Sequence, residues 1–490
     1  MNVLAATYRP SLALLTDLYE LTMAYGYWKA GLCDREAAFH LTYRENPFGG
    51  GYAVACGLEP AVEFLQRFRF EPDDLDYLAA LRGEDDGPLF EGAFLDFLGR
   101  LRLACDIDAV PEGTVVFAHE PLVRVTGPII QSQVIESALL NFINFQTLIA
   151  TKAARIVEAA EGHPVLEFGL RRAQGIDGAL SAARAAYVGG CAATSNVLAG
   201  RLYGIPVKGT HAHSWVMCFD DELAAFETYA RALPNNCVFL VDTYDTLSGV
   251  RHAIEVAGQL RRQGRRLSGV RLDSGDLAYL SIEARKLLDA AGLADVPIIA
   301  SSELDESIIT SLKEQGAKIA VWGVGTRLVT GHGEAALGGV YKLTAVRRPG
   351  GPWEDRVKLS EQQLKTSTPG VLQVRRFHDH GEFIGDAIYD VNHTPTGSST
   401  IVDPADATRR KTFHAGTESS ELLVPVFRGG RQVYELPPLE AIRRRVAGQL
   451  AALHPGVKRL VNPHRYPVGL EIGLYQRKTA LILKQRGYQP

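Results

Sequence analysis

Short apolar runs alternate with helical patterns through the middle of the chain. Six runs are rich in Val, Ile and Leu, namely "PVLEFGL", "GIPVKGT", "NCVFLVDT", "SGVRLDS", "VPIIASS" and "KIAVWGVG", and "YVGGCAATSN" is a weaker seventh. A polar or glycine-bearing turn follows each run, and a helical pattern such as "SIEARKLLDAAG" usually comes next. Fully apolar strands that alternate with helices predict a parallel sheet covered on both faces.

Polar residues follow nearly every one of these runs. In an open doubly wound sheet only the strands near the switch point share a site. In a barrel all strand ends meet at one mouth, where barrel enzymes keep their chemistry. The pattern therefore favours an α/β barrel, whose mouth collects the residues at the strand ends: Arg171, Ser195, His213, Asp242, Asp273, Ser302 and Thr326.

The pattern changes on both sides of this region. A long helical pattern begins near residue 134, so we place the barrel at residues 134–337. Residues 1–133 predict an N-terminal α+β segment, and residues 338–425 predict a strand-rich post-barrel segment. Residues 426–490, which include "PPLEAIRRRVAGQLAAL", predict a C-terminal helical segment. A chain of 490 residues is long enough for two or three domains.

Composition and charge narrow the class of protein. The 52 basic and 56 acidic residues give a net charge of −4, so no overall basic field would recruit nucleic acid. Six scattered cysteines without a C-x-x-C pair argue against a zinc module or a disulfide framework. We find neither a signal-peptide pattern nor an uninterrupted apolar run long enough for a bilayer. These features predict a cytoplasmic enzyme that binds no membrane.

Arg271 and Asp273 in "VRLDSGDL" are two residues apart on a predicted strand, so their side chains point to the same side. A guanidinium beside a carboxylate could hold an anionic substrate together with Mg²⁺. The alternative is a structural ion pair beside a helix that Ser274 or Asp276 caps.

Two further patterns are candidates for phosphate binding. Gly323 and Gly325 in "WGVGTRL" follow the last predicted barrel strand, where backbone N–H groups can surround an anion. A tight turn that needs glycine is the alternative. Arg171 and Arg172 directly follow a buried strand, where an arginine suits a phosphate. For at least one of these two arginines, a solvent-facing position is the alternative.

His211 and His213 in "GTHAHSW" lie where the chain turns after a strand. Histidines in apolar surroundings are more often hydrogen-bonded polar residues than catalysts, and no Cys or Glu at the usual spacing completes a metal site. A catalytic histidine needs a carboxylate to fix its tautomer. Asp242, at the end of the next strand, is the candidate partner for His213.

Nine motifs, in order, closely resemble those of nicotinate phosphoribosyltransferases. They run from about residue 11 to residue 345, and the resemblance continues more loosely to the C-terminus. The motifs are "LLTDLYELTMAYGYW", "NPFGGGY", "EFGLRRAQGIDGAL", "TSNVLAG", "GTHAHSW", "VDTYDTLSG", "GVRLDSGDL", "GVGTRLVT" and "LGGVYKL".

This resemblance implies a fold and a reaction. The family is a type II phosphoribosyltransferase that works as a homodimer with its active site at the subunit interface. Its irregular α/β barrel stands beside a domain built from the N-terminal and post-barrel segments. It joins nicotinate to phosphoribosyl pyrophosphate (PRPP) and releases pyrophosphate and nicotinate mononucleotide, for NAD biosynthesis. The family uses Mg²⁺ and couples ATP hydrolysis through a phosphohistidine.

The resemblance also implies roles for individual residues. His213 matches the phosphorylated histidine, and Asp242 would orient its ring. Mg²⁺ would reach Asp273 through the diphosphate of PRPP. The groups implied to contact PRPP and its phosphates are Arg171, Asp273, Gly323, Gly325 and Thr326.

The nicotinate would be held by four residues. Arg271 would bind its carboxylate, and Thr210 would be a nearby polar contact. The pyridine ring would lie between Phe168 and Tyr19 of the partner subunit. Ser195 stands where the similar nicotinamide-using enzyme has an aspartate, so the resemblance favours nicotinate.

Three other interpretations stay open. One is a nicotinamide phosphoribosyltransferase, which Ser195 disfavours. Another is a binding or regulatory protein that keeps the scaffold without turnover. A third is an unrelated phosphate-handling barrel such as an aldolase, for which Lys208 is the obvious candidate lysine, although it lies within a predicted strand. Some bacterial relatives carry a late cysteine cluster for a metal, but no cysteine follows Cys237 here, so we expect no such metal.

Overall fold

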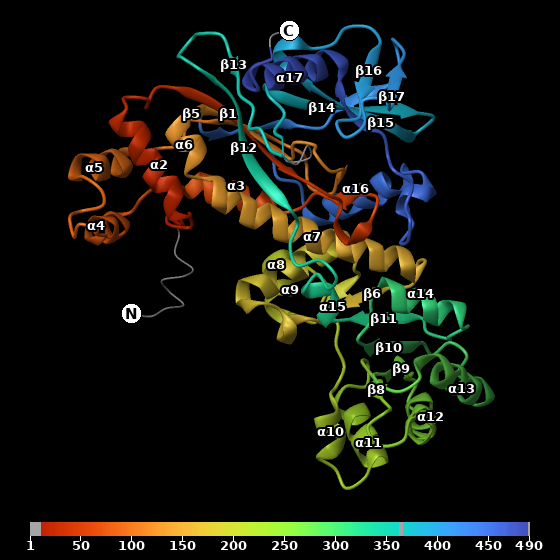
Figure 1. Cartoon of the computed structure of the whole chain (residues 1–490). Coiled ribbons are helices and arrows are strands. Elements are labelled where there is room, and N and C mark those ends of the chain that lie inside the picture. The colour runs from red at the N-terminus through yellow and green to blue at the C-terminus, as the bar shows by residue number, and fades with distance from the viewer. Residues whose placement is uncertain (1–10, 362–365, 489–490) are drawn as a thin grey trace. The chain divides into compact units, whose positions relative to one another are not determined.

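The computed structural model describes residues 11–361 and 366–488 and divides into two compact units (Figure 1). Unit 1 is built from Met1–Thr147 and Ala336–Pro490, and unit 2 is Leu148–Ala335. Unit 2 is therefore inserted in sequence between the two halves of unit 1. Its ends fall at 147/148 and 335/336, where the sequence pattern had suggested 133/134 and 337/338.

Unit 2 contains one sheet of six strands in the order β7-β6-β11-β10-β9-β8, and every neighbouring pair is parallel. Val207 adds one isolated parallel bridge to Thr194, so the "GIPVKGT" run is a bridge rather than a full strand. Across residues 148–335 the edge strands β7 and β8 do not pair with each other. The parallel α/β class is confirmed, in the form of a curled half-barrel. The strands are β6 (Val165–Glu167), β7 (Ala193–Thr194), β8 (Val238–Leu240), β9 (Gly269–Leu272), β10 (Ile298–Ser302) and β11 (Val321–Val324).

Helices follow the strands of unit 2, and polar side chains at the strand ends begin several of them. Asn196, Asp245, Asp276 and Asp305 each accept a hydrogen bond from a backbone N–H in the first turn of the next helix. Asp276 is thus the cap after β9, which leaves Asp273 available to the cavity described below. The helices are α8 (Gly175–Val188), α9 (Val197–Tyr203), α10 (His213–Met217), α11 (Glu222–Ala232), α12 (Thr246–Arg262), α13 (Leu277–Ala290), α14 (Glu306–Glu314) and α15 (Thr326–Val329).

The core of unit 2 lies on both faces of this sheet. Phe239 and Leu240 are consecutive on β8, so their side chains point to opposite faces, and both have essentially no exposed surface. Val270, Ala300 and Trp322, on three neighbouring strands, are equally buried. Side chains buried on both faces explain why these strands appear in the sequence as unbroken apolar runs.

Unit 1 holds a seven-stranded sheet in the order β13-β12-β1-β5-β3-β19-β20. Strand β1 pairs with β5 on one side and with β12, about 300 residues later in the chain, on the other. A separate pair joins β2 and β4. These strands are β1 (Glu36–Tyr43), β2 (Ala53–Val54), β3 (Asp106–Ala109), β4 (Val115–Val116), β5 (Val123–Pro128), β12 (Gly339–Arg347), β13 (Glu354–Asp355), β19 (Val424–Arg428) and β20 (Arg431–Gln432).

A second sheet of unit 1, in the order β17-β16-β21-β15-β14-β18, is built wholly from the C-terminal part of the chain. Its core contains an ion pair between Arg376 and Asp386, both at most 1% exposed. The hydroxyl of Tyr466 donates a hydrogen bond of 2.8 Å to the same carboxylate. The strands are β14 (Leu372–Asp379), β15 (Glu382–Asp390), β16 (Ser399–Val402), β17 (Arg410–Phe413), β18 (Ser419–Glu421) and β21 (Val468–Glu471).

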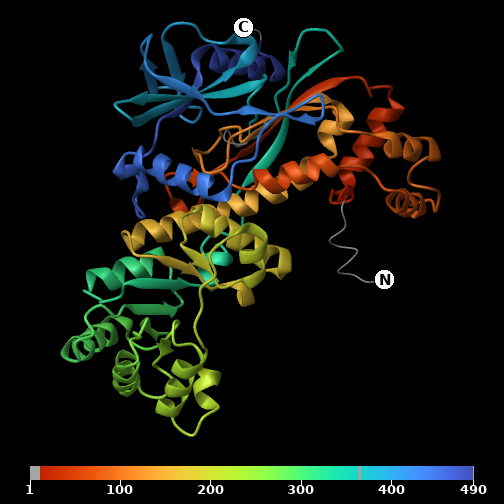
Figure 2. The ribbon, with the colours of Figure 1, turned by 180° about the vertical axis from the view of Figure 1, so that it is seen from behind.

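Helix α17 (Ile472–Gln485) packs against β16 and β21 of this sheet (Figures 1 and 2). Residues 426–490, expected to be helical, therefore contain α16 (Leu439–Ala451) and α17 but also β20 and β21. The strand runs are only two and four residues long, too short for a periodic signal. The remaining helices of unit 1 are α2 (Leu18–Lys29), α3 (Leu58–Arg67), α4 (Pro72–Ala80), α5 (Gly92–Arg100) and α6 (Ile129–Gln133).

The long helical pattern near residue 134 forms α7 (Glu136–Ala160). By length and composition the stretch Ile129–Ala160 could cross a membrane, but 67% of its most apolar window is buried inside the protein. Such burial is typical of a core helix.

Candidate active site

A cavity of about 390 Å³ lies at the C-terminal ends of the unit 2 strands. Every residue that lines it belongs to unit 2. The parallel sheet therefore brings together residues that are up to 158 positions apart in the chain. Those lining residues that the sequence pattern had singled out are Phe168, Arg171, Arg172, Ser195, Thr210, His211, His213, Arg271, Asp273, Ser302, Gly323, Gly325 and Thr326.

The guanidinium of Arg271 is held from several sides. Its Nε donates to Ser301 Oγ at 2.8 Å, and one terminal nitrogen donates to Thr210 Oγ1 at 2.7 Å. The other terminal nitrogen lies 3.2 Å from Asp273 Oδ1. The Arg271 side chain is only 13% exposed. These bonds fix the plane of the guanidinium, so its orientation is set before any ligand arrives.

Asp273 is kept ionised by its neighbours. Burial acts to raise its pKa, but the hydrogen bond from Ser301 and the positive charge of Arg271 outweigh burial and lower it. A carboxylate that is charged and one third exposed at a cavity wall can face a cation or a developing positive charge.

His213 begins α10 and lies between two carboxylates. Its Nε2 is 4.0 Å from Asp242 Oδ1 and 3.9 Å from Asp273 Oδ2, while Nδ1 is 3.2 Å from Thr243 Oγ1. The imidazole is 39% exposed and lines the cavity. Both ring nitrogens therefore have polar neighbours that can fix a tautomer, and the ring is open to a ligand.

Asp242 does not line the cavity but lies behind His213 with only 1% of its side chain exposed. Its Oδ2 accepts hydrogen bonds from the backbone N–H of Asp273 at 3.0 Å and from Ser274 Oγ at 2.6 Å. Its Oδ1 is buried without a hydrogen-bond partner among the described residues. An unpaired buried carboxylate oxygen is costly, and the nearby His213 ring is the group that could satisfy it.

His211 is in a different environment from His213. Its ring packs beside Phe226, Tyr229 and Phe239, and its Nε2 accepts a hydrogen bond from the backbone N–H of Leu240 at 3.2 Å. Burial, together with the charge of Arg271, lowers its pKa to about 4. A neutral imidazole that anchors the end of β8 is a structural element of the cavity floor.

Phe168 supplies an aromatic wall. Its ring centroid lies 5.9 Å from the guanidinium carbon of Arg271, a cation–π distance. The preceding residue, Glu167, accepts hydrogen bonds from the Gly169 backbone N–H and from Thr194 Oγ1, which hold the turn after β6. Gly323 allows the ring to lie flat against β11, because a Cβ there would be 2.7 Å from Phe168 Cε2.

Two arginines make part of the cavity rim basic. Arg171 and Arg172, in the turn after β6, are exposed and line the cavity. Thr326 follows β11, the strand next to β6, and its Oγ1 is 3.3 Å from Glu303 Oε1. Two cationic side chains near a hydroxyl and glycine backbone suit a phosphorylated ligand.

Tyr19 belongs to unit 1, on α2, and is 45% exposed. Burial of its hydroxyl and a hydrogen bond to Glu136 raise its pKa. Half of its side chain is available to another chain, whereas the cavity itself is built from unit 2 alone.

Three residues have roles in the site that sequence reasoning did not find, although Ser274 had been named as a candidate helix cap. Ser301 bonds both Arg271 and Asp273, although the sequence pattern pointed to its neighbour Ser302. Thr243 and Ser274 each follow a singled-out aspartate and contact His213 and Asp242. Each of these hydroxyls bonds a group from another strand end, so no local spacing in the sequence pointed to its role.

The donor atoms suit a metal shared with a substrate. The described residues contain no group of three or more His, Cys, Asp or Glu side chains that could hold a metal ion alone. Mg²⁺ is usually bound through one or two carboxylates plus substrate phosphates. The ionised Asp273 at the cavity wall fits that mode.

Comparisons with known proteins point to one family over most of the chain. Residues 14–144, 164–349 and 373–478 match, in turn, the N-terminal domain, the central family region and the C-terminal domain of nicotinate phosphoribosyltransferase. The chain is 44% identical over 481 residues to the nicotinate phosphoribosyltransferase of Bacillus subtilis, covering 96% of this chain and 95% of that protein. The enzyme of Mus musculus is 35% identical, covering 93% and 94%.

The fold agrees as well. The crystal structure of human nicotinic acid phosphoribosyltransferase superposes with a TM-score of 0.82 at 33% identity, covering 95% of this chain and 99% of that one. A similarity of this extent, in sequence and in fold, establishes the family: this chain belongs to the nicotinate phosphoribosyltransferases.

Proposed function

We propose that this protein joins nicotinate to PRPP, forming nicotinate mononucleotide and pyrophosphate in NAD biosynthesis. The observation that carries the proposal is the fixed guanidinium of Arg271 beneath Phe168, with the ionised Asp273 beside it. An aromatic face next to a pre-oriented cation suits an aromatic carboxylate. The family membership and the nicotinate enzymes at 35–44% identity support the same substrate.

In the proposed complex the carboxylate of nicotinate meets Arg271, and the pyridine ring stacks on Phe168. Tyr19 of the partner subunit would cover the other face of the ring in a homodimer. Thr210, which is bonded to Arg271, contributes a further polar contact. The ring nitrogen then points away from Arg271 toward the ribose of PRPP.

The reaction exchanges one bond for another at ribose C1. The pyridine nitrogen forms a bond to C1 as the bond from C1 to the pyrophosphate oxygen breaks, and pyrophosphate leaves with the electron pair. The transition state has oxocarbenium character, so positive charge develops at the ribose. Asp273 faces that charge, while Arg171 and the Gly323–Thr326 turn hold the phosphates. Mg²⁺, bound through Asp273 and the diphosphate, would supply further charge neutralisation on the leaving group.

In the proposed reaction, ATP phosphorylates His213. An imidazole nitrogen attacks the γ-phosphorus of ATP, the bond from that phosphorus to the ADP oxygen breaks, and ADP leaves. Water later attacks the phosphohistidine, the P–N bond breaks and inorganic phosphate leaves. The added charge between Asp242 and Asp273 would change substrate and product affinities, which is how hydrolysis could favour synthesis. Thr243 and Asp242 would hold the ring in place.

The test is synthesis of nicotinate mononucleotide from nicotinate, PRPP and Mg²⁺, with and without ATP, and with nicotinamide in parallel. We expect product from nicotinate and faster synthesis with ATP. Product from nicotinamide at comparable rates would assign the protein to the alternative substrate. No product from either base, with PRPP still bound, would make it a non-catalytic binding protein. We also propose that the protein acts in the cytoplasm, because its six cysteines are scattered without a C-x-x-C pair.

Ser195→Asp is expected to reduce discrimination in favour of nicotinate. The serine lines the cavity and its backbone N–H bonds the Glu167 carbonyl at 2.9 Å, so the new carboxylate would enter the base site. Like charges in a partly buried site cost several kcal/mol, so kcat/KM for nicotinate should fall by at least about 30-fold. Steady-state kinetics with both bases measure the ratio. Ser195→Asn is the neutral control, and an equal fall in that variant would assign the effect to size instead of charge.

Gly323→Ala is expected to raise KM for nicotinate by about tenfold, because the new Cβ would displace the Phe168 ring. Gly258→Ala on α12 is the matched control, since its Cβ would meet nothing within 4 Å. Steady-state kinetics give the KM for nicotinate of both variants, and a thermal melt shows whether each is folded. An unchanged KM in a folded Gly323→Ala protein would show that the position of Phe168 does not matter for the base.

A further inference from the structure

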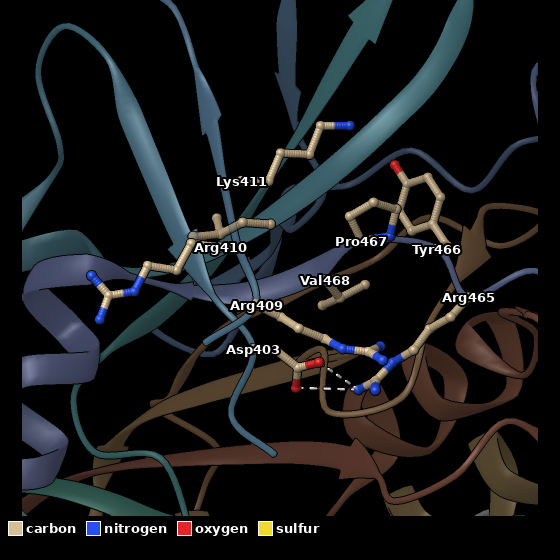
Figure 3. A pocket seen from close by; sticks show the side chains of 9 residues that line it. Asp403, Arg409, Arg410, Lys411, Arg465, Tyr466, Pro467 and Val468 are labelled. Carbon is tan, nitrogen blue, oxygen red and sulfur yellow. Dashed lines mark hydrogen bonds and ion pairs between the residues drawn. The ribbon is translucent and has the colours of Figure 1, made fainter. Parts of the chain in front are cut away.

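A second cavity lies in the C-terminal part of unit 1, and none of the residues that line it is assigned to the reaction. It has a volume of about 270 Å³ and opens between the β16–β17 hairpin and the segment that leads into β21 (Figure 3). Its polar lining residues include Asp403, Arg409, Lys411 and Arg465. The volume is close to the lower end of pockets that hold small organic ligands, on the order of 300 Å³.

Two guanidinium groups lie side by side at this cavity. Figure 3 shows the side chains of Arg409 and Arg465 converging, although they come from segments more than fifty residues apart. Their side chains are 63% and 61% exposed, so their donors face solvent at the cavity. Two adjacent cations repel each other, and an anion placed between them would relieve that repulsion.

The single carboxylate in the lining does not cancel this charge. Asp403 is 10% exposed, and its oxygens lie 3.0 and 3.2 Å from a terminal nitrogen of Arg465. One oxygen also accepts from the Ala405 backbone N–H at 2.9 Å. Asp403 thus pairs with Arg465, while among the described residues the Arg409 side chain pairs with Asp406, itself 43% exposed, at 3.3 Å.

Other cations surround the same region. Burial lowers the pKa of Lys478 to about 8, and burial lowers the pKa of Lys411. Burial and the charges of Lys478 and Arg465 together lower the pKa of His119. Burial alone accounts for the two lysine shifts, whereas at His119 the charges of Lys478 and Arg465 act together with burial, so cationic side chains lie near the cavity.

The other walls are apolar and rigid. Ile401 is 3% exposed, and Pro467 and Val468 complete the apolar surface. The ring of Tyr466 stacks on Phe117 with centroids 4.0 Å apart, and its hydroxyl is bonded to the buried Asp386. The cavity therefore combines a cationic pair with an apolar wall that is already in place.

We propose that this cavity binds a phosphoryl group, with Arg409 and Arg465 as its two ligands. Guanidinium groups match phosphate oxygens with paired N–H donors, and two of them can bind one phosphoryl group. The source is either free phosphate or a small organic phosphate whose remaining part packs on Pro467 and Val468. The site belongs to unit 1, so it does not depend on the proposed reaction.

Hydrogen-exchange mass spectrometry of the full-length protein tests the proposal, because it reports each segment separately. The probes are inorganic phosphate, ATP and adenosine at constant ionic strength. We expect phosphate-bearing probes to slow exchange in peptides that cover residues 399–413 and 465–471. No slowing with either phosphate-bearing probe, or equal slowing with adenosine, would overturn the proposal.

Arg409→Glu and Arg410→Glu form a matched pair of variants. Arg410 follows Arg409 directly and also lines the cavity, but Figure 3 shows its guanidinium pointing away from the pair. We expect Arg409→Glu to weaken binding by about tenfold or more, and Arg410→Glu by less than about twofold. Equal losses would indicate a general charge effect and overturn the assignment of Arg409. Because both arginines are exposed, neither variant removes a core contact.

The concentration dependence identifies the source of the phosphoryl group. Protection by ATP at concentrations about tenfold below those of inorganic phosphate would assign an organic phosphate. Equal concentrations would assign free phosphate. Both results support a phosphoryl site at Arg409 and Arg465.

Discussion

Arg271→Ala is expected to raise the KM for nicotinate by about 100-fold while leaving the KM for PRPP within about threefold. The guanidinium is 13% exposed and tied to Ser301, Thr210 and Asp273, so it is pre-oriented for a carboxylate. A hydrogen bond to a charged group contributes about 1.5–3 kcal/mol, and the substrate carboxylate would lose its cationic partner altogether. Steady-state kinetics with each substrate varied in turn measure both constants.

Two controls accompany this variant. Arg271→Lys keeps the positive charge but loses the fork of donors, so an intermediate KM for nicotinate is expected. A thermal melt checks that the variant stays folded, because Asp273 loses its cationic partner in it. Parallel increases in both KM values would show that Arg271 supports the cavity as a whole and does not bind the nicotinate carboxylate.

His213→Asn is expected to abolish the stimulation of synthesis by ATP while leaving ATP-independent synthesis within about threefold of the original rate. Asparagine has no ring nitrogen to accept a phosphoryl group, but it is small enough to stay beside Asp242 and Asp273. Incubation with ATP labelled at the γ-phosphate should give an acid-labile label on the protein, and this label should be absent from the variant. Initial rates with and without ATP complete the measurement.

His252→Asn is a closely matched control for this experiment. His252 lies in the same unit, is 38% exposed against 39% for His213, and pairs with Glu222 at 2.8 Å. We expect this variant to keep both the label and the stimulation by ATP. If His213→Asn loses ATP-independent synthesis to the same extent as ATP-dependent synthesis, His213 takes part in the transfer itself and not in coupling.

Much of the fold could be predicted because its strands are buried on both faces. Trp322 and Val270 lie in such strands, where an unbroken apolar run is a strong signal. The openness of the sheet could not be predicted, because it depends on Val207 making one bridge instead of a strand. A short apolar run of four or five residues does not show whether it will pair with the adjacent strand over its full length or through a single bridge.

The candidate site was predicted to the extent that it follows strand ends. Arg271 and Asp273 share a strand face, so their proximity follows from the period of two. The roles of Ser301 and Thr243 could not be predicted in the same way, because their partners come from other strands. The cavity at Arg409 and Arg465 gave no signal, since two loops more than fifty residues apart form it.

The pairing of β1 with β12 bears on how the chain is synthesised. Strand β1 ends at Tyr43, and its second neighbour is complete only at Arg347. At a translation rate of about 5–20 residues per second, some 300 residues take roughly 15–60 s to emerge. During that time the whole of unit 2 leaves the ribosome, while one edge of β1 is open to strand addition. The growing chain therefore completes the half-barrel first, and nascent unit 1 needs protection from aggregation until its last strands arrive.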